Sequence, residues 1–133
     1  MLKTINEKKI TMSDTPETLD IILRKLLSAI PEVTAAAIVS VEGLPISSAL
    51  AADIDETRIA AMTAAILSLA ERAIHEMNKG DFQEILIKGT DGYLLVLQAG
   101  RNAVLTVSTT PDIRLGLILL DAKRTCEKIA KLI

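Results

Sequence analysis

The sequence predicts a mixed α/β fold of the α+β type, in which a five-stranded antiparallel sheet is sandwiched by helices in the order α-β-β-α-β-β-β-α. Three observations lead to this prediction. Half of the 133 residues are apolar and only 2% are aromatic, so aliphatic side chains must fill the core. Three apolar segments have helical spacing, and five shorter ones are separated by turn residues. Several strands are apolar on both pleat faces, which indicates that helices cover both sides of the sheet.

The chain length suits one domain with a single core. Residues 1–13 have mixed charge and weak periodicity. We therefore expect them to form a flexible N-terminal lead-in or, alternatively, to add one strand. The single domain is then expected to cover residues 14–133.

The first predicted element is a helix that begins in the segment SDTPETL and ends before Pro31. Asp14 or Thr15 can cap it, and Pro16 suits its opening turn. Glu17 favours the positive end of the helix dipole. One apolar stripe at helical spacing is expected to face the core: Leu19, Ile22, Leu23, Leu26, Leu27 and Ile30.

A β-hairpin follows, with strands expected over residues 34–41 and 44–50. Gly43 can adopt the positive φ that a tight turn requires. Pro45 has no N–H group to donate to a strand ladder, so the second strand is predicted to lie at an edge of the sheet.

The segment 55–79 is predicted to be a long helix that begins at its cap, Asp55, and ends at Gly80 in the left-handed conformation. Placing successive residues 100° apart predicts a bulky stripe against the sheet: Ile59, Met62, Ile66, Ala70, Ala73 and Met77. The opposite side begins with small residues and continues with polar ones: Ala60, Ala61, Ala64, Ala65, Ser68, Glu71, Arg72 and His75.

The small side of this helix favours close approach by a second molecule, because an uncharged surface on the outside of a domain is typical of an association site. No remaining element of the chain is expected to cover it. The alternative is that exposed alanines only support a long helix, since alanine is the strongest helix former.

Three more strands are expected over residues 82–88, 93–99 and 103–109, joined by turns at Asp91-Gly92 and at residues 100–102. A last helix is predicted from about Asp112 to Ile133. Its core stripe has helical spacing: Leu115, Ile118, Leu119, Ala122, Cys126, Ile129 and Ala130.

Composition argues against several classes of partner. The net charge is −2 and the basic residues are scattered, so a nucleic acid is not expected. The N-terminus lacks the apolar core of a signal peptide, and no apolar stretch approaches the roughly 20 residues needed to span a bilayer. A single cysteine fits a reducing compartment. We therefore expect a cytoplasmic protein without membrane insertion.

The residues that carry chemistry do not assemble into a catalytic, metal or cofactor site. The glycines match no nucleotide-binding pattern. His75 begins the segment HEMNK, but the fifth residue is Lys79 and the chain has no second histidine to complete a zinc site. Cys126 lies on a core stripe, where packing is the expected role. The protein is predicted not to be an enzyme and to bind no cofactor.

Three motifs, in this order, resemble those of the Roadblock family, which includes dynein light chain roadblock and MglB-like proteins. They are IVSVEGLPISS (38–48), EILIKGTDGYLLVLQAG (84–100) and TPDIRLGLILLDAKRTCEKI (110–129), with the alanine-rich helix between the first two. The resemblance covers about residues 15–133 and implies a profilin-like roadblock fold.

The resemblance also implies a non-enzymatic homodimer, in which segment 82–88 pairs with its symmetry mate to extend the sheet. The implied dimer interface comprises Ala64, Leu67, Phe82, Gln83, Ile85, Leu86 and Ile87. Such proteins bind Ras-like small GTPases, and MglB-like dimers speed hydrolysis by rearranging the GTPase's own residues. The implied partner-binding residues are Ala60, Ala61, Ala65, Ser68, Arg72 and His75.

Three hypotheses for function follow. The first is a homodimeric module that regulates or scaffolds a Ras-like small GTPase. The second is a general adaptor of motor or signalling complexes whose binding ignores the nucleotide state. The third is a small-ligand sensor, which requires a pocket between the sheet and a helix; it ranks last because the sequence indicates no convergent polar groups for one.

Overall fold

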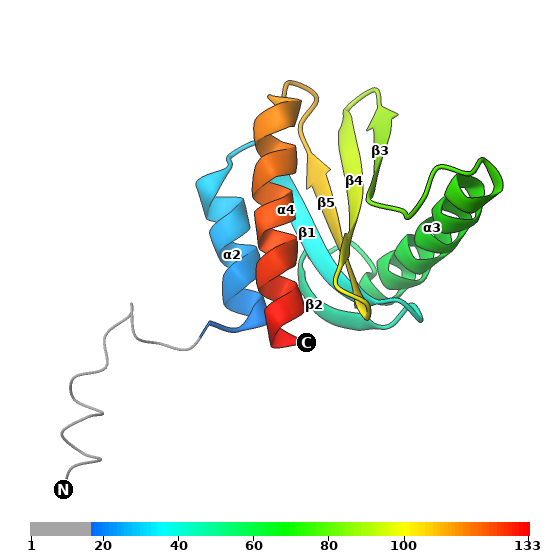
Figure 1. Ribbon diagram of the computed structural model, residues 1–133. Helices are drawn as coiled ribbons and strands as arrows, with labels where there is room; N and C mark the ends of the chain where they lie inside the picture. Colours follow the sequence, from blue (N-terminus) through cyan, green and yellow to red (C-terminus); the bar gives the residue numbers. More distant parts are fainter. Residues whose placement is uncertain (1–16) are drawn as a thin grey trace, which may run out of the picture.

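The computed structural model describes residues 17–133 and confirms the predicted mixed fold and element order (Figure 1). With labels as in Figure 1, the elements are α2 (Leu19–Ala29), β1 (Val33–Ser40), β2 (Pro45–Ala49), α3 (Glu56–Glu76), β3 (Glu84–Gly89), β4 (Gly92–Ala99), β5 (Ala103–Thr109) and α4 (Leu115–Leu132). The predicted lead-in over residues 1–13 lies outside the described residues. None of the described helices has the length and apolar character needed to cross a membrane.

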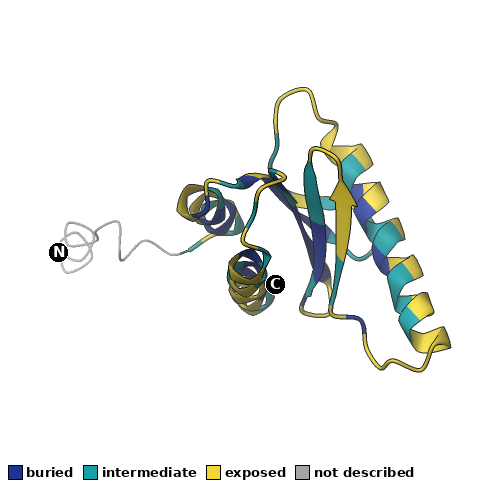
Figure 2. Cartoon of the chain, turned by 90° about the horizontal axis from the view of Figure 1, so that it is seen from above, coloured by how far each residue is buried: buried dark blue, intermediate teal, exposed yellow. Residues whose placement is uncertain are grey.

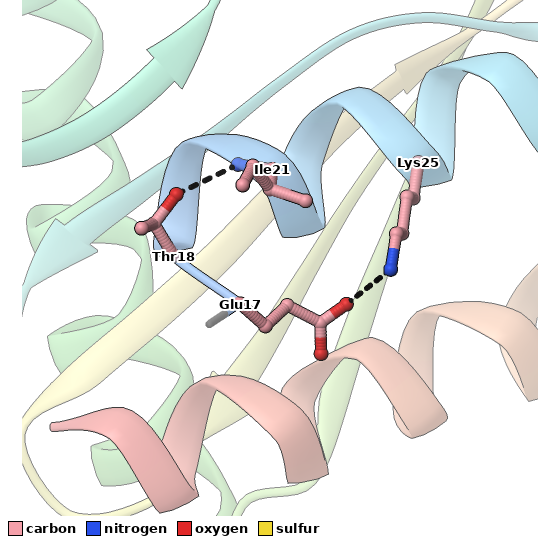
Figure 3. Close-up of polar contacts among 4 residues, drawn as sticks. All are labelled: Glu17, Thr18, Ile21 and Lys25. Atoms are coloured by element: carbon pink, nitrogen blue, oxygen red, sulfur yellow. Dashed lines mark hydrogen bonds and ion pairs between the residues drawn. The ribbon is translucent and has the colours of Figure 1, made fainter. Parts of the chain in front are cut away.

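Helix α2 begins later than predicted. Its cap is Thr18, whose Oγ1 accepts a hydrogen bond from the backbone N–H of Ile21 at 3.3 Å (Figure 3). The predicted caps, Asp14 and Thr15, are therefore wrong for this helix. Glu17 precedes the cap and binds Lys25 Nζ at 2.7 Å. The hydrogen bond from Lys25 lowers the pKa of the Glu17 carboxyl.

The five strands form one antiparallel sheet in the order β2-β1-β5-β4-β3. The β1–β2 turn contains Gly43 at φ +96°, as the sequence predicts. Pro45 opens β2, which lies at one edge of the sheet, so the predicted edge position is confirmed. Strand β3 forms the other edge.

The two faces of the sheet are covered unequally. Helices α2 and α4 lie side by side on one face, and α3 lies alone on the other (Figure 2). The core beneath α2 and α4 is the larger of the two clusters of buried apolar residues. The smaller cluster beneath α3 comprises Ala37, Val39, Ala60, Leu67, Phe82, Val96 and Val104. Because α3 contacts β1, β2 and β5, the half of this face formed by β4 and β3 is less covered.

Helix α3 begins at the predicted cap and ends before the predicted stop. Asp55 accepts hydrogen bonds from the backbone N–H groups of Thr57 and Arg58. At the other end Asn78 is the left-handed residue that directly follows the helix cap, with φ 57°, and the predicted Gly80 also has a positive φ, of 86°. The backbone N–H of Lys79 then reaches the carbonyl of Ile74 at 2.9 Å, which closes a Schellman motif.

Candidate association surface

Strand β3 presents an apolar edge to solvent. Within the described residues it pairs with β4 alone, and its register of six residues is unbroken. Leu86 and Ile87 are 41% and 39% exposed on its two faces. An exposed apolar edge strand offers unpaired N–H and C=O groups to another strand, so β3 is a candidate site of strand pairing.

The pairing edge is shorter than the predicted segment 82–88. The strand begins at Glu84, so Phe82 and Gln83 precede it. Phe82 is buried in the cluster beneath α3, which gives its side chain a core role and corrects its expected place at the edge. Ile85 is half-buried and packs against the same cluster.

The buried side of α3 differs from the prediction by about one residue position, or about 100° around the helix. The residues that face the sheet are Ala60, Thr63 and Leu67, which are 0%, 3% and 3% exposed. The expected surface position of Ala60 is therefore wrong, and Leu67, expected at the dimer interface, is buried in the core of the single subunit. Met62 and Met77, expected in the core, are exposed.

A turn of the same chain explains part of this difference. A Cβ atom built on Gly43 would lie 3.5 Å from the Cβ of Ala64 and 3.6 Å from the Cα of Ala61. The β1–β2 turn thus approaches the small side of α3 closely, which corrects the expectation that no element covers it. Close packing inside one subunit accounts for the small residues at these two positions, and Ala64 is half-buried.

Large apolar side chains are exposed on another side of α3. Met62 lines the same cavity as Leu94 of β4, so this side of the helix is directed towards β4. Leu69 follows Met62 by seven residues, on the same side of the helix, and is 65% exposed. On the sheet, Ile87 is the cross-strand partner of Leu94. We call these four residues, Met62, Leu69, Ile87 and Leu94, the apolar strip.

The apolar strip was only partly anticipated by the sequence. The sequence predicts Ile87 at the interface and Met62 in the core, and it predicts neither Leu69 nor Leu94 at the interface. The sequence gives no clear signal for Leu69, because the periodicity of this helix does not define which side faces the sheet.

The remaining predicted partner-binding residues are on the surface of α3. These are Ala61, Ala65, Ser68, Arg72 and His75. The last three also line a shallow surface depression with Glu71 and Glu76. The helix therefore presents small side chains in its first half and charged or polar ones in its second half.

Groups capable of nucleophilic or metal chemistry are not gathered in the part of the chain that the structure describes. No group of three His, Cys, Asp or Glu side chains lies close enough there to hold a metal ion. Cys126 is buried on α4, as predicted, and burial raises the pKa of its thiol to about 12. The thiol is thus protonated near neutral pH, which disfavours its action as a nucleophile.

Comparison with known proteins finds one matching family model and several relatives in sequence. The Roadblock/LC7 domain model matches residues 19–109. The uncharacterized protein MJ1340 of Methanocaldococcus jannaschii is 36% identical over 92 residues, which are 69% of this chain and 80% of that protein. The uncharacterized protein MJ0310 of the same organism is 35% identical over 92 residues, with the same shares covered.

Solved structures share the fold. The Roadblock/LC7 domain from Streptomyces avermitilis has a TM-score of 0.80 at 21% identity, covering 87% of this chain and 98% of that chain. Myxococcus xanthus MglB also has a TM-score of 0.80, at 23% identity, covering 86% and 93%. Profilin IA of Acanthamoeba castellanii has a TM-score of 0.63 at 12% identity, covering 86% and 98%, which confirms the predicted profilin-like architecture.

Proposed function

Because the chain belongs to the Roadblock/LC7 domain family, we propose that it is a non-catalytic homodimeric module that binds a Ras-like small GTPase and regulates or scaffolds it. In this proposal the protein works in the cytoplasm, where its only cysteine stays reduced. The observation that carries the proposal is the apolar edge of β3 beside the apolar strip.

The homodimer is supported by the geometry of this region. Two β3 strands pairing across a two-fold axis would satisfy the free backbone groups of both edges and continue the sheet into the second subunit. The same arrangement would bring the exposed side chains Met62, Leu69 and Ile87 of one subunit close to the other. Burying them would remove apolar surface from water, which is the main driving force of association.

The GTPase is proposed to bind the outer side of α3, at Ala61, Ala65, Ser68, Arg72 and His75. These residues are exposed in the single subunit. In a dimer the two copies of this surface would be related by symmetry, so one partner could contact both. Small side chains near Ala65 would let the GTPase backbone approach the helix closely. Arg72 would supply a charge-assisted hydrogen bond to the GTPase at the periphery of this interface.

The proposal is tested by mixing the purified chain with candidate Ras-like GTPases loaded with GDP or with a non-hydrolysable GTP analogue. We expect calorimetry to show binding that prefers one nucleotide state. Binding of equal strength to both states would contradict regulation and favour the nucleotide-independent adaptor. Absence of binding to every candidate would contradict the GTPase proposal as a whole.

A surface variant localises the binding site. Ala65→Glu places a charge at an exposed position of α3 and is expected to weaken GTPase binding at least tenfold. Asp91→Ala, in the β3–β4 turn away from α3, is the control and should bind as the wild type does. If Ala65→Glu binds with unchanged affinity, the GTPase does not use this side of the helix.

A further inference from the structure

A cavity of about 260 Å³ lies between α3 and the sheet. Its roof is formed by Ile59, Met62 and Ile66 of α3, and its floor includes Ala35 of β1 and Leu94 of β4. Leu50 and Ile54 of the loop before α3 close one side. The lining is therefore mainly apolar.

One fully buried hydroxyl group of this lining has no hydrogen-bond partner in the part of the chain that the structure describes. Thr106 of β5 is only 4% exposed, and its hydroxyl is buried with no hydrogen-bond partner among the described residues. Buried hydroxyl groups in folded proteins are nearly always paired, and an unpaired one lowers stability. A bound molecule with a polar atom would satisfy this hydroxyl group.

Thr106 is a polar residue in a cavity lining that is mainly apolar. Neighbouring Leu105 and Val107 point into the opposite core, beneath α2 and α4, whereas Thr106 lies on the α3 side with Val104. Ser108, the next residue on this side, also lines the cavity and already accepts a hydrogen bond from Thr34 at 3.2 Å. Among the fully buried side-chain oxygens of the described residues, that of Thr106 is therefore the one without a hydrogen bond.

We propose that this cavity binds a small, largely apolar molecule whose single oxygen pairs with the Thr106 hydroxyl. An apolar cavity of about 150 Å³ holds benzene, so 260 Å³ corresponds to a ligand of about ten non-hydrogen atoms. The inference goes beyond the proposed function and does not depend on it. The ligand would touch Met62 and Leu94, so the cavity shares a wall with the apolar strip.

Two probes of equal size test the proposal. In propylbenzene a methyl group replaces the hydroxyl of 2-phenylethanol, so comparing the two isolates the polar contact. Titrations of the full chain are followed by NMR at the amides around the cavity. We expect both probes to shift these amides in a saturable manner, and no saturable shift with either probe would overturn the proposal.

Substitutions locate the polar contact. Thr106→Val keeps the shape of the side chain and removes the hydroxyl. We expect it to weaken 2-phenylethanol about fivefold relative to propylbenzene, which corresponds to about 1 kcal/mol. Thr125→Val, which alters another buried threonine on α4, is the control and should leave this ratio unchanged. If Thr106→Val leaves the ratio of the two dissociation constants unchanged, Thr106 is not the ligand's hydrogen-bond partner.

Two further readouts separate ligand binding from a structural role. Because Thr106 lacks a partner, Thr106→Val is expected to raise the melting temperature of the free protein, and a lower melting temperature would contradict its lack of a partner. Ala35→Leu adds volume to the cavity wall and is expected to abolish binding of both probes. Retained binding in Ala35→Leu would place the probes elsewhere and overturn the proposal.

Discussion

The two edges of the sheet differ in how they meet solvent. Strand β2 begins with Pro45, and its register with β1 shifts between Ile38 and Val39. The hydroxyl of Ser47 donates to Asp20 of α2, and that of Ser48 donates to Glu56 of α3 at 2.9 Å. Both helices on the flanks of β2 therefore hold it.

Strand β3 lacks the proline and the register shift of β2, and its polar contact with a helix is the partly exposed ion pair between Glu84 and Lys123 of α4. It contains no proline, its register with β4 is continuous, and its exposed residues include Leu86 and Ile87. Proline, bulges and attached elements are the means by which proteins prevent unwanted strand pairing. The difference indicates that one edge of this sheet is closed and that the other is available to a partner, and substitutions can test this contrast.

The largest effect is expected from charges on the β3 edge. In the double variant Leu86→Lys/Ile87→Lys, symmetry would place like charges near one another in a paired sheet. We expect the dimer to weaken at least a hundredfold, or about 2.7 kcal/mol, so that sedimentation equilibrium gives the monomer mass of 14.3 kDa. Ile46→Lys, at a β2 position that is 40% exposed, is the control and should leave the dimer intact. If Ile46→Lys weakens the dimer as much as the β3 variant does, the two edges do not differ in their role in pairing.

The turns next to the two edge strands provide a second comparison, in stability. A Cβ atom on Gly92, the first residue of β4, would lie 2.0 Å from the carbonyl oxygen of Thr109, so the backbone must move in Gly92→Ala. At Gly43 the nearest atom would lie at 3.5 Å, and the cost comes mainly from its positive φ. We expect urea unfolding to show losses of about 3 kcal/mol for Gly92→Ala and about 1 kcal/mol for Gly43→Ala. If Gly43→Ala loses more free energy of unfolding than Gly92→Ala, the close approach of Gly92 to the Thr109 carbonyl is contradicted.

A smaller effect is expected from the apolar strip on α3. Leu69→Lys introduces a charge where the proposed dimer buries apolar surface, and we expect the dimer to weaken about tenfold, or about 1.4 kcal/mol. Leu44, next to β2, is 66% exposed, against 65% for Leu69. Leu44→Lys is therefore a matched control, and an effect as large as that of Leu69→Lys would mean that α3 does not contribute specifically.

The smallest effect concerns the ion pair that connects β3 to α4. Glu84 Oε1 lies 3.2 Å from Lys123 Nζ, and both side chains are partly exposed. We expect Glu84→Gln to change the free energy of unfolding by less than about 1 kcal/mol and to leave the dimer mass unchanged. Loss of the dimer in Glu84→Gln would show that this ion pair, and not the apolar edge, determines pairing.

Much of the fold was predictable because its signals are local. The apolar strands between turn residues, the Gly43 turn and Pro45 at an edge depend on neighbouring residues, and all three are confirmed. Helix ends were harder to place, because several residues of the right type stand close together. Thr18 caps α2 in place of Asp14 or Thr15, and the left-handed Asn78 ends α3 two residues before Gly80, which has a positive φ as predicted.

The candidate sites were less predictable because they depend on contacts distant in sequence. Helix α3 is apolar on more than one side, so its periodicity does not define which side meets the sheet. Ala60 is therefore buried where exposure was predicted, and Met62 is exposed where burial was predicted. The approach of Gly43 to Ala64 could not be read from either segment alone. The position of Thr106 in β5 is ordinary in the sequence, because its side chain simply lies on the opposite face from those of Leu105 and Val107. Only the folded structure reveals that its hydroxyl has no partner among the described residues.

Hydrogen exchange along the two edge strands tests the central claim, that β3 is the open edge used by a second copy, most directly. At concentrations where the chain is dimeric, we predict that the amides of β3 are protected and that this protection falls on dilution to the monomer. The amides of β2 should exchange at the same rate at both concentrations. Fast exchange in β3 at every concentration, or a concentration-dependent change in β2 instead, would contradict the account.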